Sequence, residues 1–328
     1  MRTTQTVAGL RLRPFAGAAD LADIARIENA EAEADGLQRR SSVEEVAARV
    51  SHASDSYDPA RDLTIAEIDG RVVAIAEREV VDTTDGLREY RLDGHVDPAW
   101  RGRGIGTELL AYNERVGREL AAREGAKSPV LGSWSWESQP ADAALLRGAG
   151  FEPVRWFFDM VRPHLDDIPD LALPEGLEIR PIVDRAQARD VWHADIEAFA
   201  DHWGGFDHSE ANLQRWLDAP TTDLSIWVVA FDGGEIAGGV INSIDEEQNA
   251  ALGHRRGWLN SVFTRRRWRR RGVASALIAR SLAVLRDRDQ DSAALGVDAD
   301  NPSGALGLYA GLGFRVDQRA IAWRKELS

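Results

Sequence analysis

The chain has 328 residues, of which 44% are hydrophobic and 29% are charged, as is typical of a soluble globular protein. This length is sufficient for two domains of ordinary size. The formal net charge of −14 argues against nucleic acid as a partner. The absence of cysteine excludes disulfides, thiol nucleophiles and thiolate metal sites.

Neither a signal peptide nor a membrane span is indicated by the distribution of apolar residues. The start of the sequence lacks an apolar core, and no apolar run approaches the roughly 20 residues needed to cross a bilayer. We therefore expect a cytoplasmic protein with no membrane partner, present as a monomer or a homodimer.

The first half begins with a short alternating strand at Leu10–Pro14, which the proline ends. A helix is expected over Ala19–Ala34. A hairpin follows, because Asp69-Gly70 separates the apolar runs Leu63–Ile68 and Val72–Ala76.

A strand at Tyr90–Val96 then leads into the loop Arg101–Gly106 and a helix over Thr107–Arg123. The half closes on Gly150-Phe151. An acidic, proline-bearing stretch between residues 163 and 174 is typical of a linker.

The second half repeats these elements in the same order. Arg101 and Arg269 are 168 residues apart and Phe151 and Phe314 are 163 apart, so the offset is nearly constant. The repeated segments are Leu177–Pro181, Ala186–Ala200, Ser225–Ala230, Ile236–Ile241, Trp258–Thr264, Arg269–Ala274, Ser275–Arg288 and Gly313-Phe314.

Each arginine-glycine loop lies between a strand and a helix, and this arrangement predicts a cradle for a pyrophosphate. Glycine allows positive φ and a close approach of backbone N–H groups to a ligand. The helix N-terminus adds unpaired N–H donors and the positive end of its dipole. Neither loop contains the dinucleotide or P-loop fingerprint.

The two loops, Arg101-x-x-Gly104-x-Gly106 and Arg269-x-x-Gly272-x-Ala274, resemble the acetyl-CoA signature of the GNAT N-acetyltransferase superfamily. The lead-in Val96–Trp100 and the closing Gly-Phe pairs strengthen the resemblance, which covers both halves. It implies an α/β fold with two tandem GNAT-like domains, each a mixed, mostly antiparallel central sheet flanked by helices. We expect the domains at residues 1–165 and 177–328, with a linker over 166–176.

The resemblance also implies which residues bind acetyl-CoA, the expected co-substrate. The run Arg265–Arg271 lies on the second cradle, so we interpret its last three arginines as phosphate ligands and not as a nucleic-acid patch. The expected cofactor-binding residues are Val262, Phe263, Thr264, Arg269, Arg270, Arg271, Gly272, Val273, Ala274, Ser275 and Asn301 in the second half, and Val96, Arg101, Gly102, Arg103, Gly104, Gly106 and Thr107 in the first.

Only the second half carries the family's later motif, an asparagine followed by a tyrosine near the CoA sulfur. Asn301 and Tyr309 occupy these positions, and Tyr309 lies five residues before Phe314. A phenol there can protonate the leaving thiolate. The residue five before Phe151 is Leu146, which has no proton to give. We therefore predict catalysis in the second half and an inactive first half that binds CoA or is structural.

The general base cannot be chosen from the sequence. The family's strand glutamate has no counterpart in Trp258–Ser261. The candidates are Glu246 or Glu247 in the preceding loop, Asp201 or His202 after the first helix of the second half, and a water relay. Asp201 is also a candidate for binding a cationic acceptor, with Trp203 as a wall of the acceptor site.

The predicted function is transfer of an acetyl group from acetyl-CoA to a primary amine of a small molecule, by direct attack in a ternary complex. The alternative is a non-catalytic protein that binds or senses acyl-CoA, which the missing strand glutamate favours. No metal site is expected, because the histidines lack carboxylates at ligand spacing.

Overall fold

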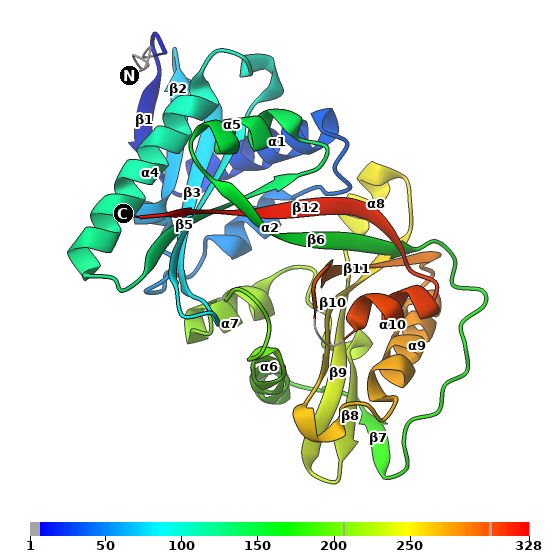
Figure 1. Ribbon diagram of the computed structural model, residues 1–328. Coiled ribbons are helices and arrows are strands. Elements are labelled where there is room, and N and C mark those ends of the chain that lie inside the picture. Colours follow the sequence, from blue (N-terminus) through cyan, green and yellow to red (C-terminus); the bar gives the residue numbers. More distant parts are fainter. Residues whose placement is uncertain (1–6, 206, 302–303, 328) are drawn as a thin grey trace. The chain divides into compact units, whose positions relative to one another are not determined.

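The protein forms two compact units, seen in a computed structural model that describes residues 7–205, 207–301 and 304–327 (Figure 1). The first unit contains the chain up to Arg155, the segment Trp203–Ala219 and the chain from Ala320 onward. The second unit contains Trp156–His202 and Pro220–Arg319.

The first unit is built on a sheet whose strands follow the order β1-β2-β3-β4-β5-β12. Its pairs are antiparallel except for β4 and β5, which are parallel. The strands are β1 (Arg11–Pro14), β2 (Leu63–Ile68), β3 (Arg71–Asp82), β4 (Arg88–Val96), β5 (Pro129–Trp136) and β12 (Arg315–Glu326). The helices are α1 (Ala18–Ala34), α2 (Val43–Arg49), α3 (Pro59–Asp62), α4 (Ile105–Glu124), α5 (Pro140–Gly148) and α7 (Glu210–Asp218).

The second unit repeats this plan, with strands in the order β7-β8-β9-β10-β11-β6. Its parallel pair is β10 with β11, and the others are antiparallel. The strands are β7 (Leu177–Arg180), β8 (Val228–Asp232), β9 (Glu235–Ile244), β10 (Arg256–Thr264), β11 (Ser292–Asp298) and β6 (Glu152–Arg162). The helices are α6 (Arg185–Phe199), α8 (Glu246–Leu252), α9 (Val273–Arg286) and α10 (Ala305–Gly311).

The expected fold class is confirmed, since each unit is a mixed, mostly antiparallel sheet with helices. The units do not coincide with the two halves of the chain, however. Strand β6 follows the elements of the first half but pairs with β11 in the second unit. The last residues of the chain, in β12, pair with β5 in the first unit. Each half therefore gives its last strand to the other unit.

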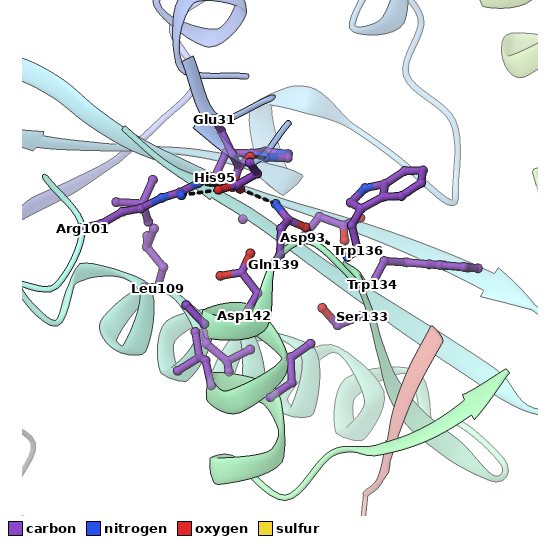
Figure 2. Close-up of a pocket in the computed structure, with 18 of the residues that line it drawn as sticks. Glu31, Asp93, His95, Arg101, Leu109, Ser133, Trp134, Trp136, Gln139 and Asp142 are labelled. Atoms are coloured by element: carbon purple, nitrogen blue, oxygen red, sulfur yellow. Dashed lines mark hydrogen bonds and ion pairs between the residues drawn. The ribbon is translucent and has the colours of Figure 1, made fainter. Parts of the chain in front are cut away.

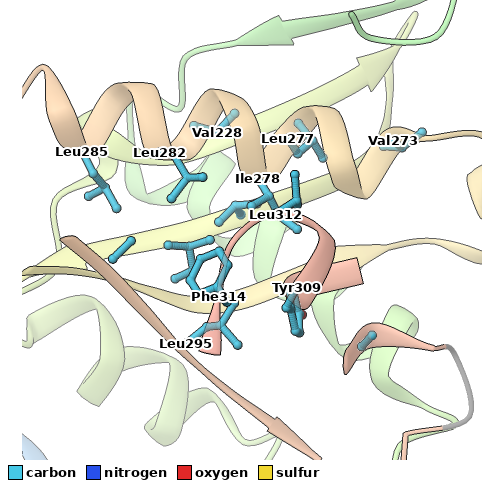
Figure 3. Close-up of a cluster of buried hydrophobic side chains, with 14 of the residues drawn as sticks. Val228, Val273, Leu277, Ile278, Leu282, Leu285, Leu295, Tyr309, Leu312 and Phe314 are labelled. Carbon is cyan, nitrogen blue, oxygen red and sulfur yellow. The ribbon is translucent and has the colours of Figure 1, made fainter. Parts of the chain in front are cut away.

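The exchanged strands supply core residues to the units that they join. Trp323 in β12 is fully buried in the first unit, where its Nε1 donates to Ser135 Oγ at 2.9 Å. Met160 in β6 belongs to the core of the second unit. That core is completed by the apolar stripe of α9, which includes Val273, Leu277 and Leu285 (Figure 3).

Among the described residues, no helix combines the length and the apolar character needed to cross a membrane.

Candidate active site

The two arginine-glycine loops have the same backbone geometry. In the first loop, Gly102 and Gly104 adopt φ of 75° and 86°. In the second, Arg270 and Gly272 occupy the matching positions with φ of 59° and 85°. Helices α4 and α9 begin directly after Gly104 and Gly272, and no side chain caps either N-terminus. The N–H groups of the first helical turn are thus available to an anionic ligand.

The strand before each loop separates from its parallel neighbour. The ladder between β4 and β5 covers Arg88–Arg91, and that between β10 and β11 covers Arg256–Trp258. The remainder of β4 and β10 lies beyond these ladders, so its backbone groups do not pair with β5 or β11. In addition, β10 has an irregularity in its pairing with β9 between Leu259 and Ser261. Bulges of this kind redirect side chains next to active sites.

The first arginine of each loop is held by the protein. Arg269 Nη2 donates to the carbonyl of Ala198 at 2.8 Å, and its Nε donates to the carbonyl of Thr264 at 3.0 Å. Arg101 forms a two-pronged pair with Asp35, at 2.6 and 2.8 Å. Arg101 therefore ties its loop to the end of α1, and Arg269 ties its loop to α6.

Asp201, one of the expected base candidates, is an exposed ion-pair partner. Arg266 Nε donates to its Oδ2 at 3.0 Å, and Arg269 lies 3.5 Å from the same oxygen. The hydrogen bonds from these two arginines lower the pKa of Asp201. A carboxylate with a lowered pKa is a poor base, so the structure argues against Asp201 in that role.

The remaining candidates for the general base or the acceptor site, His202, Trp203 and Glu247, each have a different environment. His202 packs against Phe199, with ring centroids 4.2 Å apart. Trp203 belongs to the first unit, where the guanidinium of Arg324 lies 4.4 Å from its ring centroid. Glu247 is exposed in the first turn of α8, next to Glu246, where the helix dipole favours a carboxylate.

Tyr309 lies in the core of the second unit, where it is 7% exposed (Figure 3). Its ring contacts Phe314 edge to face, with centroids 6.1 Å apart. Burial raises the pKa of Tyr309 to about 12, which keeps the phenol protonated at neutral pH. Asn301 forms part of the turn between β11 and α10, donating its N–H to the carbonyl of Asp298 at 3.2 Å.

A carboxyl that the sequence analysis missed faces the strand before the second cradle. Asp195 on α6 accepts a hydrogen bond from Ser261 Oγ on β10 at 2.5 Å. Burial raises the pKa of Asp195 to about 6, against the effect of Ser261. The repeat contained a signal: Glu28 and Asp195 are 167 residues apart, as are Arg13 and Arg180, so both halves have a carboxyl at this helical position.

The first unit contains a cavity of about 970 Å³. One part of its wall is the predicted cradle, from Val96 and Arg101 to Thr107, of which only Arg103 is not in contact with the cavity. Another part carries the ionisable side chains of Glu31, Asp93, His95 and Asp142, with Trp134 and Trp136 nearby (Figure 2). None of these six residues lies in a motif that the sequence reveals.

Electrostatics inside this cavity differ from those of an exposed acidic surface. Burial raises the pKa of Asp93, and burial together with Glu31 raises the pKa of Asp142 to about 6. Oxygen atoms of Glu31, Asp35 and Asp142 approach within 4.8 Å of one another. Arg101 pairs with Glu31 and Asp35 and compensates their charge, so we assign no metal to this group.

Comparison with known proteins decides the family. The acetyltransferase (GNAT) family matches residues 22–151 and again residues 189–314. The chain belongs to the acetyltransferase (GNAT) family.

Relatives of this GNAT protein include several mycothiol acetyltransferases. That of Salinispora tropica is 29% identical over 300 residues, which cover 90% of each chain. That of a Nocardioides species is 32% identical over 229 residues, which cover 67% of this chain and 74% of the relative. These matches identify this GNAT protein as an N-acetyltransferase.

Solved structures show the same tandem architecture. A GCN5-related N-acetyltransferase from Sphaerobacter thermophilus is 27% identical, with a TM-score of 0.68 and coverage of 97% of this chain and 96% of the other. A tandem GNAT protein from the clavulanic acid biosynthesis pathway shares the fold, with a TM-score of 0.69 at 19% identity and coverage of 97% and 98%. The expected tandem arrangement of two GNAT domains is thereby confirmed.

Members of the GNAT family use acetyl-CoA as a co-substrate, and the cradles fit its pyrophosphate. Both loops present backbone N–H groups at an uncapped helix N-terminus.

Proposed function

We propose that this GNAT protein transfers the acetyl group of acetyl-CoA to a primary amine of a small molecule, and that the reaction takes place in the second unit. The observation that carries the proposal is the hydrogen bond between Asp195 and Ser261, next to the second cradle. It supplies a carboxyl on the strand side of the cradle, where the sequence lacks a glutamate.

In this proposal the second cradle holds CoA. The N–H groups at the start of α9 and the side chains of Arg270 and Arg271 bind the pyrophosphate. The backbone of Val262–Thr264 binds the pantetheine, and an N–H group there polarises the thioester carbonyl. Asn301 contacts the cofactor from the turn before α10. Both reactants bind together, so alignment supplies much of the rate.

Asp195 acts as the general base. The attacking amine must lose a proton, and a carboxyl with a pKa of about 6 is ionised at neutral pH yet more basic than an exposed aspartate. Ser261 Oγ donates a hydrogen bond to Oδ1 of Asp195 and thereby orients the carboxyl. The proton passes to Oδ2, directly or through one water molecule.

Tyr309 acts as the general acid. As the C–N bond forms and the C–S bond breaks, CoA leaves as a thiolate that requires a proton. A buried phenol with a pKa of about 12 is protonated at neutral pH and can supply that proton. The phenolate then recovers a proton from solvent or from the attacking amine.

The relatives support the proposed acceptor class. The relative from Salinispora tropica, which is 29% identical over 90% of the chain, is named for the acetylation of a thiol compound, mycothiol, and not of a protein. A small primary amine is therefore the acceptor that we propose for this chain. The identity of the amine is left to experiment, because acceptor pockets belong to the site and not to the fold.

The test is a measurement of thiol release from acetyl-CoA with a panel of primary amines that includes glucosamine, 1,4-diaminobutane and L-lysine. Tyr309→Phe removes the proposed acid, and we expect kcat to fall about 10²-fold or more. Gly272→Glu places a carboxylate in the second cradle and should abolish the turnover that this cradle supports. Tyr112→Phe, on α4 of the first unit, is the matched control for loss of a phenol. Full activity in both Tyr309→Phe and Gly272→Glu would overturn the proposal.

A further inference from the structure

The first unit has its own candidate reaction centre, although Leu146 led the sequence analysis to expect an inactive half. Resting on the proposed function, we infer that the cavity of the first unit is a second acyl-transfer site, in which His95 accepts a proton from a primary amine. The cavity joins three components that such a site needs: a CoA cradle, a base and a place for an ammonium group.

The cradle opens into the same cavity as the ionisable residues. Gly102, Gly104 and Thr107 line it from the loop and from the start of α4, while Asp93 and His95 line it from β4. These two β4 residues lie beyond Arg91, the last residue of the ladder with β5. The backbone at this edge is therefore placed to bind an extended pantetheine, with its thioester near His95.

His95 and Glu31 form a pair suited to general-base catalysis. The carboxylate of Glu31 contacts His95 Nδ1, and Glu31 is only 3% exposed. This contact leaves Nε2 as the nitrogen that exchanges protons with a substrate. Burial, the largest single influence, lowers the pKa of His95, but the charge and hydrogen bond of Glu31 together with the charge of Glu28 raise it above its usual value. A carboxylate behind an imidazole makes the ring a stronger base.

Carboxyl groups close to His95 suit a protonated amine. Asp93 precedes His95 by two residues on β4, so both side chains point to the same face of the strand. Asp142 extends from α5 toward Glu31 and His95 (Figure 2). Both carboxyls are desolvated, as their raised pKa values show, and a cation would relieve the cost of ionising them. Trp134 adds aromatic surface for cation–π contact, whereas the ring of Trp136 already has the guanidinium of Arg39 5.8 Å from its centroid.

The reaction balances without a phenol. His95 Nε2 takes one proton from the ammonium, and the neutral nitrogen attacks the thioester carbonyl carbon. The C–N bond forms, the C–S bond breaks and the electron pair of the C–S bond leaves on sulfur. The second nitrogen proton goes to that thiolate. The products are the N-acetyl amine and CoA, with one proton released through His95.

Two matched substitutions separate the two centres. Thr107→Asp and Ser275→Asp each place a carboxylate in the first turn of α4 or α9, where it repels pyrophosphate but favours the helix. Arg123→Gln on α4 and Arg280→Gln on α9 change the charge by the same amount at exposed positions and serve as controls. Circular dichroism checks that each variant folds.

Thiol release is measured with acetyl-CoA and the amines glucosamine, 1,4-diaminobutane and L-lysine. We expect Ser275→Asp to retain turnover with at least one amine, and the double variant with Thr107→Asp to lose it. Within Ser275→Asp, adding His95→Gln should lower kcat about 10²-fold while the KM for acetyl-CoA stays unchanged. A structural role for His95 would instead change KM and folding.

The outcomes distinguish this inference from the proposed function. If Ser275→Asp alone abolishes turnover with every amine, the second centre does not exist and the proposed function stands. If Thr107→Asp alone abolishes turnover and Ser275→Asp does not, the first unit is the reaction centre and the proposed function fails. If the double variant keeps full activity, neither cradle serves the reaction and both are overturned.

Discussion

Replacing Asp195 by asparagine should make the protein more stable and less active at the same time. Asparagine has nearly the same shape, and its Oδ1 can still accept the hydrogen bond from Ser261. The variant lacks only the ionisable group. An effect on stability can therefore be assigned to the charge of Asp195, and a loss of turnover to its basicity.

The size of the stability effect follows from the pKa of Asp195, which burial raises from 3.8 to about 6. At 1.36 kcal/mol per pKa unit, this shift corresponds to about 3 kcal/mol. Since the unfolded carboxyl ionises near its ordinary value, the folded state holds the proton more tightly. The contribution of this carboxyl to the free energy of unfolding is fully present below about pH 4 and is lost as the pH rises through about 6. An asparagine side chain does not titrate, so the Asp195→Asn variant keeps this stability at higher pH.

The assay compares urea unfolding of the wild type and Asp195→Asn between pH 4 and pH 7.5. The difference in unfolding free energy should grow from near zero to about 3 kcal/mol in favour of the variant. At pH 7.5 its turnover should fall about 10²-fold or more. Asp190→Asn, an exposed position on the same helix, is the control. A difference that does not change with pH, or a variant with wild-type turnover, would refute the assignment of Asp195.

Three further substitutions test the fold and the site. Trp323→Ala should destabilise the first unit by about 3–5 kcal/mol, because this side chain is fully buried and donates a hydrogen bond to Ser135. Amide hydrogen exchange should then increase in β5 and not in β10. The reverse pattern would contradict the strand exchange. Gly205→Ala should make proteases cleave the segment Trp203–Ala219 faster, because the new Cβ would lie 2.3 Å from the carbonyl oxygen of Asp82. An unchanged rate of cleavage would argue against that close contact. Asp201→Asn should preserve the acidic limb of the pH–rate profile, since the paired carboxylate has a lowered pKa; loss of the limb would restore Asp201 as the base.

The cradles were predictable because their geometry is local. Positive φ at Gly104 and Gly272 depends on the absence of a side chain at those positions, and glycine is visible in the sequence. The helix that starts directly afterwards is equally local. Asp195 could not be selected in the same way, because its raised pKa depends on burial against β10 and on Ser261, 66 residues later.

The cavity of the first unit was even less predictable from the sequence than Asp195. Its wall combines Glu31 from α1, His95 from β4 and Asp142 from α5, and no motif links residues at such separations. Leu146 stands at the position that corresponds to Tyr309 in the repeat. The expectation of an inactive first half depended on that one residue. The ionisable groups that bear on the question meet only when α1 and α5 pack beside the end of β4.

The repeat in the sequence determined by itself that two copies of one fold follow each other, since each copy shows the same strand, loop and helix patterns in the same order. Tertiary structure alone decided which copy each closing strand completes. The alternation of β6 and β12 specifies a strand with a buried face, but backbone hydrogen bonds are the same for any neighbour. The partner is chosen by packing, as Trp323 shows by filling the core of the first unit from the far end of the chain.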